Sequence, residues 1–162
     1  MSLTSKQQVF ITVAEMETKG DISGLKVVLN DGLNKELTIN EAKETLSHLY
    51  AYTGFPRSLN ALNALQQVIK EREEKGLKTE KGVEADALPT DYDALKTGTA
   101  IQTQLTGGKP FCYTFAPQMD YYLKAHLFGD IFSRNNLTFV DRELITIGAI
   151  SALPGCDSQL LA

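Results

Sequence analysis

The chain has 162 residues, of which 43% are hydrophobic and 22% charged, and its formal net charge is −4. This length and composition are typical of a soluble globular protein, and we expect a single domain over residues 1–162. The acidic balance argues against nucleic acid or an anionic membrane as a partner, since either would need clustered Lys and Arg. No apolar run approaches the ~20 residues that span a bilayer, and the N-terminus shows no secretory signal, so we expect a cytoplasmic protein.

Two short helices are predicted at the start of the chain. The pattern Ser5-x-x-Gln8 opens a stretch of apolar residues at helical spacing, which Gly20 closes. A second helix covers about Ile22–Asn30 and ends at Gly32. Both ends follow from a glycine placed just after the last apolar position.

A longer helical hairpin follows. Thr38-x-x-Glu41 forms a capping box, in which the Thr hydroxyl and the Glu carboxylate each accept a hydrogen bond from an N–H group at the helix start. Gly54 then ends the first arm, and Pro56 suits the first turn of the second arm, which continues to Gly76. The tight corner between the arms predicts two antiparallel helices.

The remaining residues divide into a charged segment and further helices. Residues 71–90 carry many charges and few large apolar side chains, which indicates a linker or mobile loop. Helices are predicted over Asp91–Leu105 and Phe115–Phe132, and Thr138 caps a last helix, Phe139–Leu153. No segment alternates in the manner of a strand, so the chain is predicted to be all-α.

The helical pattern begins twice. Residues 7–27 align without gaps on residues 142–162, at a constant offset of 135, and the first copy continues through the hairpin whereas the second stops at the C-terminus. We therefore expect a first repeat over 3–70, a charged linker over 71–90 and a truncated second repeat over 115–162. Because a repeat unit usually cannot bury its apolar face alone, we also expect a homo-oligomer.

Two segments carry a family resemblance. YAYTGFPRSLNAL, which begins at Tyr50, and HLFGDIFSRNNLTFVDREL, from His126 to Leu144, resemble the carboxymuconolactone decarboxylase family, which is related to alkylhydroperoxidase D. The similarity covers almost the whole chain except the charged linker and looks like the tandem-repeat branch. It implies an alkylhydroperoxidase D-like helical bundle that forms homo-oligomers. It also implies chemistry on small organic acids, such as decarboxylation of γ-carboxymuconolactone, or a thiol relay in the peroxidase branch.

The cysteines do not match the peroxidase branch. That branch needs Cys-x-x-Cys followed by His, whereas Cys112 and Cys156 are isolated and far apart in the sequence. Without two neighbouring thiols there is no dithiol to be oxidised and reduced, so we predict reduced cysteines and no thiol relay. A peroxidase-like activity without CxxC is the least favoured alternative.

The decarboxylase branch is matched in part. It carries an Arg-Glu pair at the start of one helix, which Arg142-Glu143 matches, and a His after a Gln-Leu pair. The residues before Ala162 match the second element, but the chain ends where the His would come. In the first repeat, Gln7-Gln8 stands in place of Arg-Glu. Val28 falls at the His position of this first repeat, so neither copy of the decarboxylase pattern is complete.

Glu143 is the first catalytic candidate on physical grounds. Its helix is apolar on nearly every side, so the carboxylate is expected to be partly buried, and burial raises a carboxyl pKa towards the range useful for proton transfer. Free N–H groups at the helix start favour the anion instead, which leaves the direction of the pKa shift open. The alternative is a structural acid that pairs with Arg142 or with a neighbouring chain.

His48 is the second catalytic candidate. It lies four residues after Glu44 and four before Tyr52, so the three side chains share one helical face. A carboxylate beside a His can fix the imidazole tautomer and poise it as a base. We expect this face to lie opposite the apolar stripe of its helix, where a solvated or subunit-interface His is the alternative.

Four further residues are candidates for substrate binding. Arg57, near a helix N-terminus, would anchor a substrate carboxylate together with free N–H groups, although an exposed Arg is equally ordinary there. Tyr52, Arg142 and His126 complete the set, and a core or interface position is the alternative for His126. No residues have metal-ligand spacing and no Gly-rich phosphate loop follows a strand, so we predict no metal and no cofactor.

Two classes of function remain open. One is a cofactor-free decarboxylase or lactone-processing enzyme that acts on a small organic acid. The other is a non-catalytic oligomeric binding or scaffold protein with a degenerate active site. The enzyme predicts Glu143 and a His in one closed pocket. The scaffold predicts Glu143 exposed, or held in a salt bridge far from every His.

Overall fold

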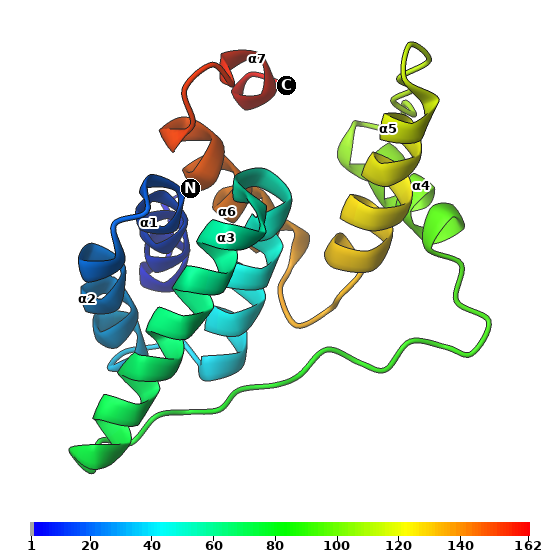
Figure 1. The fold of residues 1–162 in the computed structure, drawn as a ribbon. Helices are drawn as coiled ribbons and strands as arrows, with labels where there is room; N and C mark the ends of the chain where they lie inside the picture. The colour runs from blue at the N-terminus through cyan, green and yellow to red at the C-terminus, as the bar shows by residue number, and fades with distance from the viewer. Residues whose placement is uncertain (1) are drawn as a thin grey trace. The chain divides into compact units, whose positions relative to one another are not determined.

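The structure, a computed structural model, describes residues 2–162 (Figure 1). Every regular element in this range is helical and no strand occurs in it, which confirms the all-α class. None of the helices within it has the length and apolar character needed to cross a membrane. The helices are α1 (Ser5–Lys19), α2 (Ile22–Leu33), α3 (Ile39–Glu74), α4 (Ala94–Leu105), α5 (Pro117–Tyr121), η1 (Tyr122–Phe132), α6 (Phe139–Ala152) and α7 (Asp157–Leu160).

The described residues group into two compact units. Unit 1 comprises the residues up to Glu84 together with Leu137–Ala162, and unit 2 comprises Ala85–Asn136. The sequence predicts one domain over residues 1–162, and the division at 84/85 falls inside the segment predicted as a linker. Unit 1 therefore holds α1, α2, α3, α6 and α7, and unit 2 holds α4, α5 and η1.

Local capping sets both ends of α1. The Thr4 hydroxyl accepts a hydrogen bond from the Gln7 N–H, and the Gln7 side chain accepts one from the Thr4 N–H. This capping box lies one residue before the predicted Ser5-x-x-Gln8, because Thr4 has the extended backbone that an N-cap requires. Gly20 ends the helix in the left-handed conformation, with φ 70°, as predicted.

α3 is a helix broken into two arms at the predicted corner. Its N-terminus carries the capping box of Thr38 and Glu41. Gly54 interrupts the helix with φ 83° and ψ 163°, a conformation that side chains other than glycine rarely adopt. Pro56 follows in the first turn of the second arm, where its missing N–H has no helical partner to lose. Figure 1 shows the two arms folded back beside each other.

The two copies of the sequence repeat lie side by side in unit 1. α1 and α6 run parallel: Gln7 Nε2 donates to Asp141 Oδ1 at 3.4 Å, and Gly148 approaches Ala14 further along. A Cβ on Gly148 would lie 2.8 Å from the Ile11 carbonyl oxygen, so a larger residue would force the helices apart. The contacting residues Gln7 and Asp141 are 134 positions apart, which is close to the offset of 135 between the two copies.

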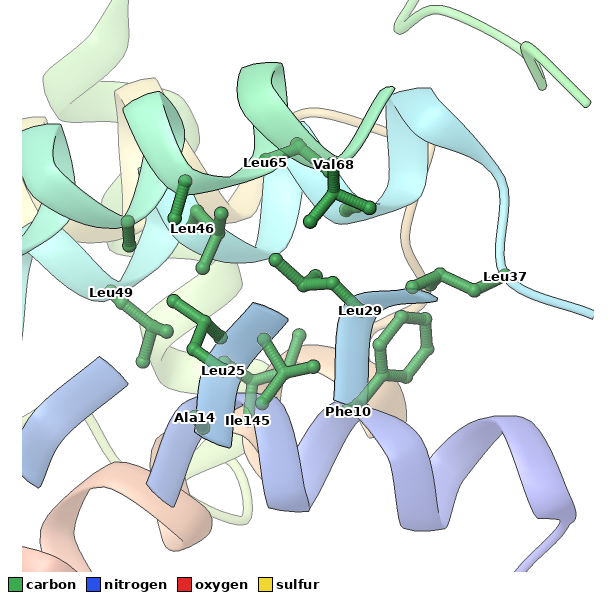
Figure 2. Close-up of a cluster of buried hydrophobic side chains, with 14 of the residues drawn as sticks. Phe10, Ala14, Leu25, Leu29, Leu37, Leu46, Leu49, Leu65, Val68 and Ile145 are labelled. Atoms are coloured by element: carbon green, nitrogen blue, oxygen red, sulfur yellow. The ribbon is translucent and has the colours of Figure 1, made fainter. Parts of the chain in front are cut away.

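Unit 1 is built around one apolar core (Figure 2). Leu25 and Leu29 of α2 are fully buried among side chains of α1, α3 and α6. Burial of each leucine contributes about 1.5–3 kcal/mol. The buried apolar residues of the core are Phe10, Val13, Ala14, Leu25, Leu29, Leu33, Leu37, Ala42, Leu46, Leu49, Ala61, Ala64, Leu65, Val68, Leu137, Ile145 and Ala149.

The first part of the segment 71–90, predicted as a linker or mobile loop, is held against unit 1 by hydrogen bonds to Arg72. Arg72 lies in the last turn of α3 and is only 2% exposed. Its guanidinium donates to side-chain oxygens of Asn30, Asn34 and Thr79 at 2.7–2.8 Å, and to the Lys78 carbonyl oxygen at 3.0 Å. The composition of the segment shows its charges but not these acceptors.

Residues 80–82 accept hydrogen bonds from groups at the start of α3. The Glu80 carbonyl accepts from the Ile39 N–H, and the Lys81 carbonyl accepts from the Asn40 N–H, both at 2.9 Å. The Asn40 side chain also donates to the Gly82 carbonyl at 3.0 Å. Since the first N–H groups of a helix have no partner within it, residues 80–82 supply acceptors that α3 itself lacks.

Unit 2 packs α4 against η1 at two glycines. A Cβ on Gly98 would clash with the Lys124 carbonyl oxygen, and a Cβ on Gly129 would clash with the Ala94 carbonyl oxygen. The two backbones therefore meet directly. Asp93 caps α4 through the Lys96 N–H, so the helix starts inside the predicted range of 91–105.

The helix predicted over Phe115–Phe132 differs from the observed structure in two respects. Regular structure begins only at Pro117, because proline favours the first helical position. From Tyr122 the backbone forms a π-helix, with i→i+5 hydrogen bonds. The Tyr92 hydroxyl donates to the Gly129 carbonyl in this stretch. The apolar pattern alone does not distinguish this helix from an α-helix.

We expect Arg72→Met to destabilise unit 1 by about 2–4 kcal/mol, because at least four oxygens lose a charged donor. Urea denaturation measures the loss, and amide exchange at Ile39 and Asn40 should accelerate as residues 80–82 detach. Lys70→Met, at an exposed position of the same arm, is the control. Equal stability of the two variants would contradict the role given to Arg72.

Candidate functional site

A buried polar cluster lies between the first arm of α3 and α6. Glu44, His48 and Tyr52 occupy successive turns of α3, and Arg142 and Thr146 face them from α6. The spacing predicted that these side chains share one face. It did not predict that the face is buried, with His48 1% exposed and Glu44 6%. α6 covers this face, so a solvated His48 is ruled out. We refer to these five residues as the α3–α6 cluster.

An ion pair holds one end of the cluster. Arg142 Nη2 donates to Glu44 Oε1 at 2.8 Å, and the two side chains are 0% and 6% exposed. The sequence left open a pair between Arg142 and Glu143, but the carboxylate that binds the guanidinium in the structure is Glu44. A fully buried, paired Arg142 has no surface to offer a substrate, which corrects its predicted role in substrate binding.

His48 is neutral and held in one tautomer. Burial, and after it the charge of Arg142, lowers the pKa of His48 to about 3. Its Nδ1 lies 3.4 Å from Arg142 Nη1, which can only donate, so Nδ1 is the acceptor. The proton is then on Nε2, which donates to the Thr146 hydroxyl at 3.0 Å. A neutral imidazole sealed in this way is not poised as a base at neutral pH.

Tyr52 connects the cluster to Glu143. Its hydroxyl lies 3.1 Å from Thr146 Oγ1, and its ring centroid is 5.5 Å from that of His48. Burial raises the pKa of Tyr52 to about 12, and the negative charge of Glu143 adds to the rise. The phenol therefore stays protonated and lies within the electrostatic reach of the Glu143 carboxylate.

Glu143 is a half-buried carboxylate that makes no hydrogen bond or ion pair with any of residues 2–162. Desolvation by burial raises its pKa, which settles the direction left open by the sequence. Thr138 caps the start of α6, where its hydroxyl accepts a hydrogen bond from the Asp141 N–H. A desolvated acid without a partner is suited to holding and releasing a proton.

Glu17 is a second buried acid, and it is not among the residues predicted from the sequence. Glu17 is 1% exposed, and its Oε1 accepts a hydrogen bond from the Thr53 hydroxyl at 2.8 Å. Burial raises the pKa of Glu17, while Thr53 and the charge of Arg57 oppose the rise. Its position on the buried Phe10–Val13 face of α1 was the available signal.

Arg57 belongs to this second group rather than to the α3–α6 cluster. Its side chain is exposed and passes close to Gly20, where an added Cβ would meet the guanidinium. Among residues 2–162, Arg57 makes no hydrogen bond or ion pair with Glu143, and its charge acts on Glu17. The predicted anchor is therefore accessible, and it lies beside Glu17 at the end of α1.

The other candidate residues are in unit 2 or in the C-terminal segment. His126 lies on η1 with its side chain 45% exposed and Nδ1 2.8 Å from Asp130 Oδ2, so it is not a core residue of unit 2. Cys112 is exposed and Cys156 half-buried, and both are free thiols. Within residues 2–162, no three His, Cys, Asp or Glu side chains are grouped as metal ligands.

Comparison with known proteins does not extend this assignment. The chain matches no model of a protein family, and no curated protein matches it.

We expect either single substitution Arg142→Met or Glu44→Met to destabilise the protein by about 3–5 kcal/mol, because each leaves a buried charge without its partner. The double variant should recover most of that loss. Urea denaturation of all four proteins gives the coupling energy. The exposed pair Lys70–Glu74 is the control, with a coupling within about 1 kcal/mol of zero. Additive losses at Arg142 and Glu44 would refute the ion pair.

The lowered pKa of His48 predicts acid sensitivity. Between the folded pKa of about 3 and the ordinary histidine pKa of 6.5, the unfolded chain binds a proton that the folded protein does not. The contribution of His48 to the free energy of unfolding should therefore be fully present above this window. It should fall as the pH decreases through the window, by at most about 1.4 kcal/mol per pH unit. His48→Gln should remove this part of the slope in pH-dependent denaturation, whereas His126→Gln should retain it.

Proposed function

We propose that this protein is a cofactor-free enzyme of the carboxymuconolactone decarboxylase type, with the alkylhydroperoxidase D-like helical fold, acting on a small organic acid in the cytoplasm. The observation that carries the proposal is the state of Glu143: half-buried, desolvated and without a partner beside the phenol of Tyr52. Such an acid does not stabilise the fold, and shifted groups of this kind are concentrated at functional sites.

The proposed step is delivery of a proton by Glu143. When the C–C bond to the departing carboxyl group breaks, CO2 leaves and the electron pair stays on the substrate. The protonated Glu143 carboxyl then donates its proton to that carbon, and the resulting carboxylate is reprotonated from solvent. A raised pKa increases the fraction of Glu143 that carries the proton near neutral pH. The protonated phenol of Tyr52 would bind a substrate oxygen.

His48 takes a different role in this proposal from the one expected. Its neutral imidazole connects Arg142 to Thr146 and so holds α3 and α6 in register. We therefore treat it as a positioning residue that keeps Tyr52 beside Glu143. The exposed guanidinium of Arg57 remains the proposed anchor for a substrate carboxylate.

The second candidate is a non-catalytic oligomeric binding or scaffold protein. Two large apolar side chains of α6 support it, since Val140 is 61% exposed and Ile147 45%. Exposed apolar residues on a helix face favour burial against another chain, here a second copy. In this reading the α3–α6 cluster is structural only, and Glu143 has no substrate.

We expect the protein to release CO2 from γ-carboxymuconolactone and Glu143→Gln to lower kcat by about 100-fold or more, the usual contribution of a positioned acid. Because the protonated form is required, kcat of the parent should fall as the pH rises through the Glu143 pKa. Glu73→Gln, at an exposed position of α3, is the matched control and should leave kcat unchanged.

Two outcomes would count against the enzyme. Full activity of Glu143→Gln would remove Glu143 from the chemistry. A folded parent protein that turns over no lactone acid, together with a Glu143 carboxyl that titrates near 4.5 by NMR, would favour the scaffold.

A further inference from the structure

A groove of about 570 Å³ runs between the two arms of α3 in unit 1. We propose that it binds an amphipathic carboxylate, a small anion with an apolar chain such as a medium-chain fatty acid. The groove is separate from the α3–α6 cluster, because its residues Lys43 and Ser47 each precede a cluster residue by one position. One position is about 100° around an α-helix, so the two sites lie on different faces of the same arm.

The floor of the groove is aliphatic and comes from both arms. Leu65 is 2% exposed, and three further side chains are half-buried and pack against the core beneath them. Fixed by that packing, they present a preformed apolar surface to solvent. The four aliphatic residues are Ile39, Leu62, Leu65 and Ile69.

The rim of the groove is cationic. Lys43 and Lys81 are its only charged residues, and no Asp or Glu lines it, although the chain as a whole has 20 acids and 16 bases. Lys43 makes no ion pair or hydrogen bond with any of residues 2–162. Lys81 is paired with Glu84 at 3.3 Å, but both side chains are about three-quarters exposed, at 74% and 73%, so the pair is easily exchanged.

The cationic end is held in position by the backbone. The Lys81 carbonyl accepts from the Asn40 N–H, and the Asn40 side chain donates to the Gly82 carbonyl. Lys81 is therefore anchored at the start of α3, where it lines the groove, rather than on a free loop. This arrangement allows a carboxylate to lie at the lysines while its apolar chain lies on the aliphatic floor.

The size and chemistry of the groove select this occupant. Its volume lies within the range of small-molecule sites, roughly 300–1,000 Å³. A cation would be repelled by the lysines, and a short anion such as acetate would leave the apolar floor uncovered. The neutral side chains Ser47, Asn63 and Gln66 add hydrogen-bonding groups at the edges. Each methylene fully buried on the floor should raise affinity by up to about fourfold.

The test is titration of the full chain with decanoate below its micelle concentration, followed by calorimetry and by NMR. We expect saturable binding of one decanoate, weaker binding of hexanoate and none of acetate or decyltrimethylammonium. Lys43→Gln should weaken decanoate binding by about three- to tenfold, because one charged partner is lost. Lys70→Gln, on the same helix but outside the groove, should leave decanoate binding unchanged.

A matched pair of tryptophans tests the location. Gln66 lines the groove and its neighbour Gln67 does not, and both are exposed, so neither substitution disturbs the core. Gln66→Trp should abolish decanoate binding and Gln67→Trp should retain it. Equal binding by both variants, equal binding of decyltrimethylammonium, or no decanoate binding by the parent would overturn the proposal. So would light scattering that shows a second copy released by Gln66→Trp, since the groove would then be an interface.

Discussion

The buried ion pair between Arg142 and Glu44 constrains the rest of unit 1. Neither charge reaches water, so each needs the other, and the pair can form in only one register of α6 on α3. Once that register is set, the next turn of both helices brings His48 to Thr146 at 3.0 Å. The pair also explains why His48 is neutral, because burial and a neighbouring guanidinium both disfavour an imidazolium.

The repeat places two related helices together but gives them different chemistry. α1 and α6 run side by side in parallel, with Gln7 bonded to Asp141. Where α6 has Arg142 and Glu143, the first copy has Gln7 and Gln8, so only α6 brings charge to the first arm of α3. α1 meets the same arm later, through Glu17 and Thr53. Two copies of one pattern therefore yield a five-residue polar cluster at α6 and, at α1, one buried acid bonded to Thr53.

Local signals in the sequence were enough for the helices but not for the environment of the site. Caps at Thr38 and Gly20 and the break at Gly54 depend on neighbouring residues, so their positions could be predicted. The burial of His48 depends on α6, some hundred positions away in the chain, and no spacing rule reports that. Arg72 shows the same limit, since its acceptors come from α2 and from the segment after α3.

The cluster also decides which residue is free to act. A histidine that fixes the register of two helices through both ring nitrogens cannot exchange protons with a substrate without breaking that register. Glu143 has no such task, because Arg142 is already neutralised by Glu44 and the α6 cap is already formed by Thr138. Its desolvation is uncompensated by any contact in residues 2–162, which is unfavourable for folding above its pKa. The sealed pair thus fixes the register of α6 on α3, and the adjacent position on the same helix is left with a half-buried acid that makes no hydrogen bond or ion pair with residues 2–162.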